Sequence, residues 1–362
     1  MQKFKKIILL TSIYGFSLTA NADSIFEKNT SEGFKRFSIT AGLLSAFPLG
    51  KFNDLDLKTA LQNDKEYAIG DVSTQTVLDA IDRNNSTGNS AYNSINLLKP
   101  LLPNLPSALS GTAVVSQPTS FQTSDTGLEV KDVHTLGLLL KYHYNDAISF
   151  ELKGGFPPKV KAKGIGTVYA PVIGEVNLPL LSAILVGTDK VPVNTSIHIS
   201  DLDSVNQVVT ARAWLPALEM QYQFGKAGTD KFRPFVGVGI MYAYLNDLKL
   251  DPVIEGNLVL AGHRVQNILD DKAGAGLEGL TSSGKPVVRV KTKDAIAPMA
   301  TLGFTYDFSE EWFASASVTY AKLEIDAEID VINSVNDKKL INAKNTITVD
   351  PLISFMGIGY RF

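Results

Sequence analysis

The chain ends Ile353-Ser354-Phe355-Met356-Gly357-Ile358-Gly359-Tyr360-Arg361-Phe362, and the alternation of residue types in this stretch predicts the fold. Every second side chain from the C-terminus is aromatic or apolar: Phe362, Tyr360, Ile358 and Met356. The residues between them are Arg361, Gly359 and Gly357. A β-strand repeats every two residues, so one face is apolar and the other is small or polar. A closing strand with a terminal Phe is typical of outer-membrane β-barrels, whose apolar face contacts lipid.

The N-terminus has the pattern of a secretory signal peptide, which we expect at residues 1–22. Three lysines precede an apolar run at residues 7–18, and Ala20-Asn21-Ala22 is a small-x-small cleavage site. The mature chain, residues 23–362, would then begin at Asp23. A membrane anchor is the alternative, but the apolar run is shorter than the ~20 residues that a spanning helix needs.

Composition excludes several classes of protein. The chain has no cysteine, so it has no disulfide scaffold, iron–sulfur cluster or cysteine nucleophile. Without the signal peptide it carries 31 basic and 37 acidic residues, a formal net charge of −6. This mild acidity gives no electrostatic footprint for nucleic acid.

Eight segments alternate in polarity as the strands of a transmembrane barrel do. They cover residues 36–45, 133–144, 147–156, 214–224, 232–245, 296–308, 312–328 and 345–362. Short turns such as Asn145-Asp146 and Ser309-Glu310 join neighbouring segments into hairpins. The sequence therefore predicts an all-β fold, an eight-stranded antiparallel transmembrane β-barrel with long extracellular loops and both chain ends on the periplasmic side.

Long connections alternate with the short turns, at about residues 46–131, 161–210, 249–292 and 330–344. The first is far longer than an ordinary loop, so it should have structure of its own or be disordered. Residues 55–63 and 77–82 read as short helices. The apolar stretches in these loops have two interpretations, packing among the loops or an apolar vestibule that captures hydrophobic solutes.

At its strands the chain resembles the OmpW family of small outer-membrane barrels. The residues that carry the resemblance are FRPFVGVG at 232–239, LP at 215–216, YQFG at 222–225, ISFEL at 148–152, DP at 350–351 and GYRF at 359–362. The resemblance implies an eight-stranded barrel with a narrow lumen through which small hydrophobic molecules pass. It also implies a route that enters from outside and leaves sideways through the wall into the membrane.

An eight-stranded barrel leaves an interior that side chains nearly fill. Strand alternation places charged and polar residues there: Arg36, Lys141, His143, Glu151, Lys153, Glu219, Gln221, Arg233, Asp307, Thr319 and Arg361. Unpaired charges in so small a space are costly, so we expect them to pair. They would form either a polar plug that stiffens the barrel and prevents leakage, or a group that closes the periplasmic half and directs apolar solutes through the wall.

The resemblance also implies a constriction formed by apolar side chains on two strands. The corresponding positions in this chain are Lys153 and Thr319. Neither residue is apolar, so the sequence departs from the family here. Either Glu151 or Glu219 neutralises Lys153, or Phe235, Met241 or loop residues form the constriction. We expect lateral opening near Pro157-Pro158 or Pro298, because proline lacks a donor for strand pairing.

We expect no cofactor, metal site or catalytic site. The four histidines, at 134, 143, 198 and 263, lack metal-ligand spacing, and Asp201 and Asp203 lack the pattern of a calcium loop. An enzyme acting on lipid A would need a histidine beside a serine near the outer leaflet. Neither His134, on an outward parity, nor His143, near a periplasmic turn, suits that task.

The sequence therefore predicts a channel of the bacterial outer membrane for passive uptake of small hydrophobic molecules. The expected partners are those solutes, outer-membrane lipids and lipopolysaccharide. The alternative is a structural or receptor barrel whose long loops bind host, phage or bacteriocin. These patterns encode neither the identity of the solute nor the oligomeric state.

Overall fold

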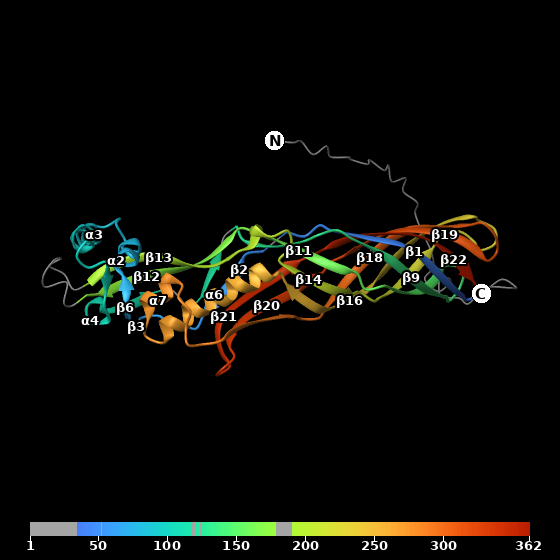
Figure 1. Ribbon diagram of the computed structural model, residues 1–362. Helices are drawn as coiled ribbons and strands as arrows, with labels where there is room; N and C mark the ends of the chain where they lie inside the picture. Colours follow the sequence, from blue (N-terminus) through green and yellow to red (C-terminus); the bar gives the residue numbers. More distant parts are fainter. Residues whose placement is uncertain (1–34, 52, 117–119, 124, 179–189) are drawn as a thin grey trace.

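Eight antiparallel strands close into a barrel at one end of an elongated molecule, to the right in Figure 1. The computed structural model describes residues 35–51, 53–116, 120–123, 125–178 and 190–362, so the expected signal peptide lies outside the described residues. The barrel strands are β1 (Phe37–Pro48), β9 (Val133–His143), β10 (Ile148–Gly155), β15 (Ala217–Gln223), β16 (Phe232–Leu250), β18 (Ala295–Asp307), β19 (Trp312–Ala321) and β22 (Pro351–Arg361). Pairing of β15 with both β10 and β16 closes the barrel. The fold class that strand alternation predicts is confirmed.

The two ends of the barrel sequence meet, because β1 pairs along its whole length with β22. Phe37 and Phe362 exchange backbone hydrogen bonds at 3.2 and 2.8 Å, and their rings stack. On β22, Met356 and Ile358 are exposed to the lipid side, whereas Ile353 and Phe355 are buried inside. The alternating faces of the terminal segment therefore separate lipid from lumen as predicted.

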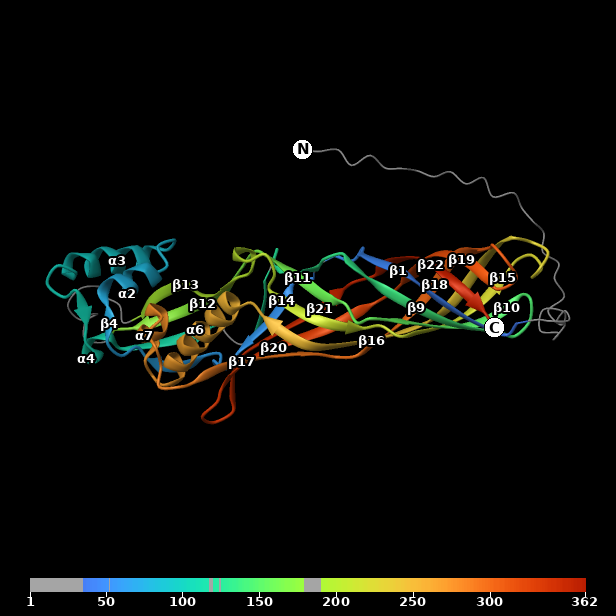
Figure 2. The ribbon, with the colours of Figure 1, turned by 45° about the vertical axis from the view of Figure 1, so that its right-hand side comes forward.

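Beyond the barrel, the long connections build an ordered extension instead of irregular loops (Figures 1 and 2). Three short strands continue the barrel wall: β8 (Gly127–Val130), β11 (Lys159–Ile165) and β14 (Val209–Trp214). A five-stranded sheet contains β17 (Pro286–Thr292), β20 (Glu324–Asn333), β21 (Lys338–Thr348), β2 (Leu55–Thr59) and β7 (Ser120–Thr123). A four-stranded sheet contains β13 (Lys190–Asp201), β12 (Thr167–Asn177), β6 (Thr112–Ser116) and β3 (Lys65–Ala68).

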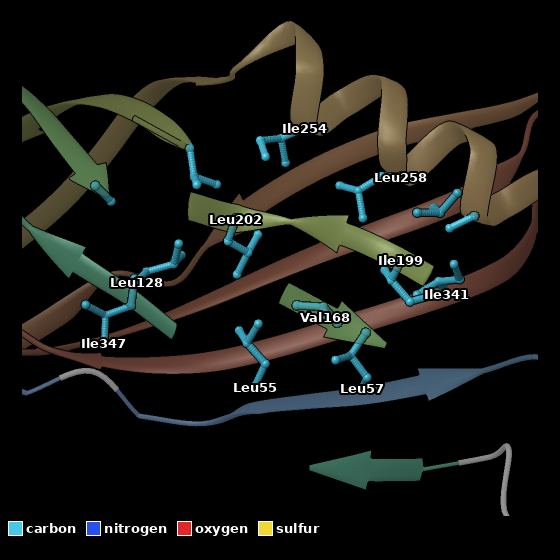
Figure 3. Packing of buried hydrophobic residues seen from close by; sticks show 14 of the residues in the cluster. Leu55, Leu57, Leu128, Val168, Ile199, Leu202, Ile254, Leu258, Ile341 and Ile347 are labelled. Atoms are coloured by element: carbon cyan, nitrogen blue, oxygen red, sulfur yellow. The ribbon is translucent and has the colours of Figure 1, made fainter. Parts of the chain in front are cut away.

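An apolar core fills the part of the extension next to the barrel and reaches down into the barrel. Figure 3 shows Leu57, Ile199 and Ile341 meeting from different strands, with Ile254 and Leu258 on the helix α6 (Pro252–Leu269) above them. Pro252 opens this helix and Asp251 caps it by accepting a hydrogen bond from the Val253 amide at 3.0 Å. Apolar residues of several loops thus pack against one another in this core, as the first of the two interpretations expects.

The distal end of the extension is a second, smaller core. It lies between the four-stranded sheet and the helices α2 (Thr74–Ala80), α3 (Ser86–Leu98) and α7 (Ala273–Glu278). A two-stranded pairing of β4 (Val72–Ser73) with β5 (Asn104–Leu105), the short α4 (Ser107–Ser110) and the 3-10 turn η2 (Leu202–Ser204) complete the extension. Among the described residues, no helix has both the length and the apolar character to cross a membrane.

Three expectations about local structure need correction. The helix expected at residues 55–63 is wrong, because Leu55 and Leu57 are buried while Asp56 and Lys58 are exposed, the two-residue period of β2. The helix expected at 77–82 begins earlier, as α2, with Ser73 as its N-cap. The long strands expected at 312–328 and 345–362 each break in two, since the chain leaves the barrel for the five-stranded sheet near Leu323 and Val349.

Candidate functional site

The inward faces of the barrel strands carry the polar residues that alternation places there. Lys141, His143, Glu151, Glu219, Gln221, Arg233 and Thr319 are buried. The side chains of Lys153, Asp307 and Arg361 are 14%, 13% and 12% exposed. Arg36 donates to the Tyr144 carbonyl at 3.3 Å, at the periplasmic turn. The structure gathers these residues into two groups at different depths of the lumen.

We name the group that lies farther from the periplasmic turns the plug. It comprises Lys141, Glu151, Lys153, Glu219, Gln221, Thr301 and Thr319. Glu151 and Glu219 are cross-strand neighbours on β10 and β15, where like charges repel. The Lys153 ammonium lies 2.8 Å from the Glu219 carboxylate and 3.8 Å from that of Glu151. Lys141 lies 3.1 Å from Glu151, and the Gln221 amide donates to Glu151 and Glu219 at 3.0 and 2.7 Å. Two ammonium groups thus neutralise two buried carboxylates, and hydrogen bonds hold them in place.

The two threonines complete the plug on the opposite wall. Lys153 donates to the hydroxyl oxygens of Thr301 and Thr319 at 3.2 and 3.3 Å, and Thr301 donates to Glu219. Gly237 leaves the space for this carboxylate, because a Cβ there would lie 2.3 Å from a Glu219 oxygen. Thr301 is an additional member of this group that was not predicted, although its inward parity on β18 is a usable signal in the sequence.

The second group lies at the periplasmic end of the lumen, around an open hollow of about 430 Å³. Arg361 pairs with Asp307 at 2.7 Å, and its guanidinium lies 4.3 Å from the centroid of the Phe313 ring. Arg233 donates to the carbonyls of Gly225 and Asp146 in the periplasmic turns. This group therefore ties the turns together below the plug.

Above the plug, the barrel encloses an apolar cavity of about 350 Å³. Lys153 and Thr319 of the plug border it, and Leu139, Met241, Met299, Ile353 and Phe355 line its walls. Met241 therefore lies where a constriction could form. Phe235 does not line the cavity. It is buried on the periplasmic side of the cavity, where its ring centroid lies 4.9 Å from the Lys141 ammonium. Leu323 and Val349 border the cavity from the extension, so the packed core of the extension lies beyond it.

The barrel wall is interrupted beside this cavity. Strand β10 pairs with β15 only as far as Lys153 opposite Ala217, and β11 pairs with β14 from Lys159 opposite Arg212. Residues 154–158 and 213–216 lie between these ladders, joined by a hydrogen bond from the Ala213 amide to the Pro158 carbonyl at 3.1 Å. We name this interruption the window. Phe156, Pro157, Trp214 and Pro216 line both the window and the cavity.

The other place considered for an opening, Pro298, lies in a continuous part of the wall. It pairs with Ile240 across the β16–β18 ladder, and its carbonyl accepts from the Lys322 amide at 3.0 Å. The wall is therefore weak near Pro157-Pro158 and intact near Pro298.

The histidines lie apart from one another. His134 is exposed beside Ser45, 2.8 Å away, and His143 faces the lumen near Ser38, at 3.3 Å. In the part of the chain that the structure describes, no three His, Asp or Glu side chains gather in a way that could hold a metal ion.

Comparisons with known proteins find similarity to outer-membrane proteins. The OmpW family model matches residues 276–362, the segment that contains β17 to β22. Outer membrane protein W of Vibrio cholerae is 25% identical over 236 residues, which are 65% of this chain and 76% of the relative.

Solved structures of two outer-membrane proteins are also similar. OprG from Pseudomonas aeruginosa shares 16% identity at a TM-score of 0.48, over 91% of this chain and 96% of its own. Outer membrane protein W of Escherichia coli shares 16% identity at a TM-score of 0.31, over 91% of this chain and 98% of its own.

Proposed function

We propose that the chain is an outer-membrane β-barrel of the OmpW family and a channel for passive uptake of small hydrophobic molecules, because the OmpW family model matches residues 276–362 and a relative of 25% identity is an outer membrane protein W. Its location is the bacterial outer membrane, and the family suggests small-molecule transport. The apolar cavity above the plug is the observation that carries the finer proposal, because an uncharged apolar solute is the ligand that such a lining favours.

In the proposed route, the solute rests in the cavity and leaves through the window. The plug blocks the straight path to the periplasm, because crossing it would separate buried ion pairs. Sideways movement past Phe156 and Trp214 meets no charged group of the plug. Entry is at the base of the extension, since the packed core closes the long axis of the extension itself.

Narrowing the window tests this route. A Cβ at Gly154 would have no heavy atom closer than the Leu138 carbonyl oxygen at 4.0 Å, so Gly154→Phe adds bulk beside the window without a backbone clash. We expect equilibration of a labelled hydrophobic solute into proteoliposomes to fall toward the rate of protein-free liposomes. The matched control is Ala300→Phe, which adds the same bulk to an exposed site on β18, where pairing is continuous.

Unchanged uptake by the Gly154→Phe variant, with the barrel folded, would contradict lateral exit. A fall in both variants would indicate damage to the barrel in general. Heat-modifiable migration in gels, a property of folded barrels, gives the folding control in each case.

A receptor role for the extension is the second candidate. At its tip, Leu97 and Leu101 are 78% and 79% exposed, a placement typical of contact surfaces. Replacing both with Ser and measuring uptake and cell adhesion separately distinguishes the two functions. Lost adhesion with normal uptake would favour the receptor.

A further inference from the structure

A row of basic side chains runs up the outer surface of the wall, directly beyond the barrel. On β11, Lys159, Lys161 and Lys163 are exposed, while Val160 between them lines the apolar cavity and Ala162 belongs to the core. Arg212 lies opposite Lys159 on β14 and is also exposed. We name these four residues the basic ladder. Four residue steps along β11 span about 13 Å.

Few carboxylates oppose the basic ladder. In the described chain, none of its three lysines has a carboxylate within the 4.0 Å of an ion pair. Three acids interact with it without such a pair to a lysine of the ladder: Glu129, the cross-strand neighbour of Lys163, Asp203, which feels the charge of Lys163, and Asp247, which feels that of Lys159. Asp247 is held by Lys249 at 2.9 Å and by Arg212 at 3.8 Å. This surface therefore keeps an excess of positive charge in a chain that is acidic as a whole.

The five-stranded sheet contains a row of basic side chains whose charges are neutralised by acidic partners. Arg289 and Lys291 on β17, and Lys293 directly after its end, alternate in the same way, but each has an acidic partner. The partners are Asp337 at 3.8 Å, Asp330 at 4.0 Å and Asp326 at 3.1 Å. Strand geometry alone therefore does not leave lysines without partners, and the basic ladder is distinct in this respect.

The position of the basic ladder relative to the membrane indicates its ligand. Trp214 lies two residues from Arg212 on the same face and pairs with Tyr244 on β16; both rings are exposed. Phe156, also exposed, precedes Lys159 by three residues. Exposed aromatic rings at the rim of a barrel mark the membrane interface. The basic ladder therefore begins where the charged headgroups of the outer leaflet lie.

We propose that the basic ladder binds the phosphate groups of an outer-leaflet glycolipid. Ammonium and guanidinium groups are strong partners for phosphate oxygens, and each basic residue near a charged lipid surface adds to binding. This proposal does not depend on the transported solute.

The test uses the full chain in nanodiscs of neutral phospholipid, with bisphosphorylated lipid A as the probe and its dephosphorylated form as the second lipid. The variant is Lys159→Gln/Lys161→Gln/Lys163→Gln. Its matched control is Lys58→Gln/Lys285→Gln/Lys338→Gln, which removes three exposed charges from the extension. Lipid retained on the purified protein is counted by native mass spectrometry at several salt concentrations.

We expect the first triple variant to bind bisphosphorylated lipid A on the order of 10²-fold more weakly, and the control triple to bind as the wild type does. Binding by the wild type should fall with added salt. Equal binding by the first variant, or equal retention of dephosphorylated lipid by the wild type, would overturn the proposal. Displacement of the lipid by millimolar inorganic phosphate would show a site for the free anion and would also overturn it.

Discussion

At the scale of single residues, Lys153 contacts both the charged plug and the apolar cavity above it. Its ammonium neutralises the carboxylate of Glu219, and its side chain also borders the apolar cavity. A charged residue can occupy a place where the family resemblance implies an apolar one, because the paired carboxylate cancels its charge toward the cavity. The hydroxyl of Thr319 accepts from the same ammonium, so the two departures from the family pattern form one unit.

We predict that Lys153→Leu alters solute passage while the barrel stays folded. It leaves Glu219 and Glu151 facing each other with Lys141 as their remaining cation, and removing one partner of a buried pair costs about 3–5 kcal/mol. Thermal unfolding followed by heat-modifiable migration measures the stability, and single-channel recording measures passage.

The double variant Lys153→Leu/Glu219→Gln is the control, since it removes the unbalanced charge and should recover most of the lost stability. Unchanged conductance and solute flux in Lys153→Leu would count against a role for Lys153 in the lumen.

Sequence reasoning placed most lumen residues on the inward face because charged side chains have one acceptable side of a barrel wall. It missed Thr301, because threonine is compatible with either face and its inward parity is a weaker signal than a charge; its hydrogen bond to Glu219 shows its role. Of the alternatives for a constriction, Met241 borders the apolar cavity and Phe235 does not, because alternation gives the face of a side chain and not its depth along the lumen.

At the scale of elements, the barrel strands were predictable and the extension was not. The helix predicted at residues 55–63 is one example. Residues 55–59 instead pair with β21, nearly 300 residues away in sequence, and also with β7. Such long-range pairing leaves little local signal, whereas barrel hairpins pair with their neighbours in sequence.

Also at this scale, we predict a pH-dependent contact between α6 and the segment that follows α7. The Ser282 amide donates to Nδ1 of His263 at 3.1 Å, and burial lowers the pKa of His263 below its usual value. The neutral imidazole is the acceptor, so the contact is present near neutral pH and is lost as pH falls through the lowered pKa. Amide hydrogen exchange at residues 280–284, corrected for intrinsic rates, should accelerate between pH 7 and pH 5.

The variant His263→Gln should abolish this acceleration, because it removes the titrating group. The control is His198→Gln, elsewhere in the extension, which should keep the wild-type pH profile. Protection of residues 280–284 that does not change with pH in the wild type would refute the prediction.

At the scale of the whole molecule, two kinds of stabilisation meet at the apolar cavity. The barrel is held by backbone hydrogen bonds between strands that close on themselves, with the window as an interruption at its upper rim. The extension is held by its packed apolar core, as a water-soluble protein is. The barrel pattern was readable in the sequence because each strand alternates on its own, but the extension core depends on which distant segments come together.

We predict that this difference makes the extension separable from the barrel. Leu340 is fully buried, so Leu340→Ala should destabilise the extension by roughly 2–5 kcal/mol. Limited proteolysis should then cut the variant within residues 53–116 or 252–292 before it cuts the barrel. The matched control Met356→Ala shortens a side chain that is 71% exposed on the lipid face and should leave the cleavage rate unchanged.

Loss of heat-modifiable migration in Leu340→Ala would show instead that extension and barrel unfold as one unit, because the core that runs down to Met241 and Met299 would then be required for barrel closure.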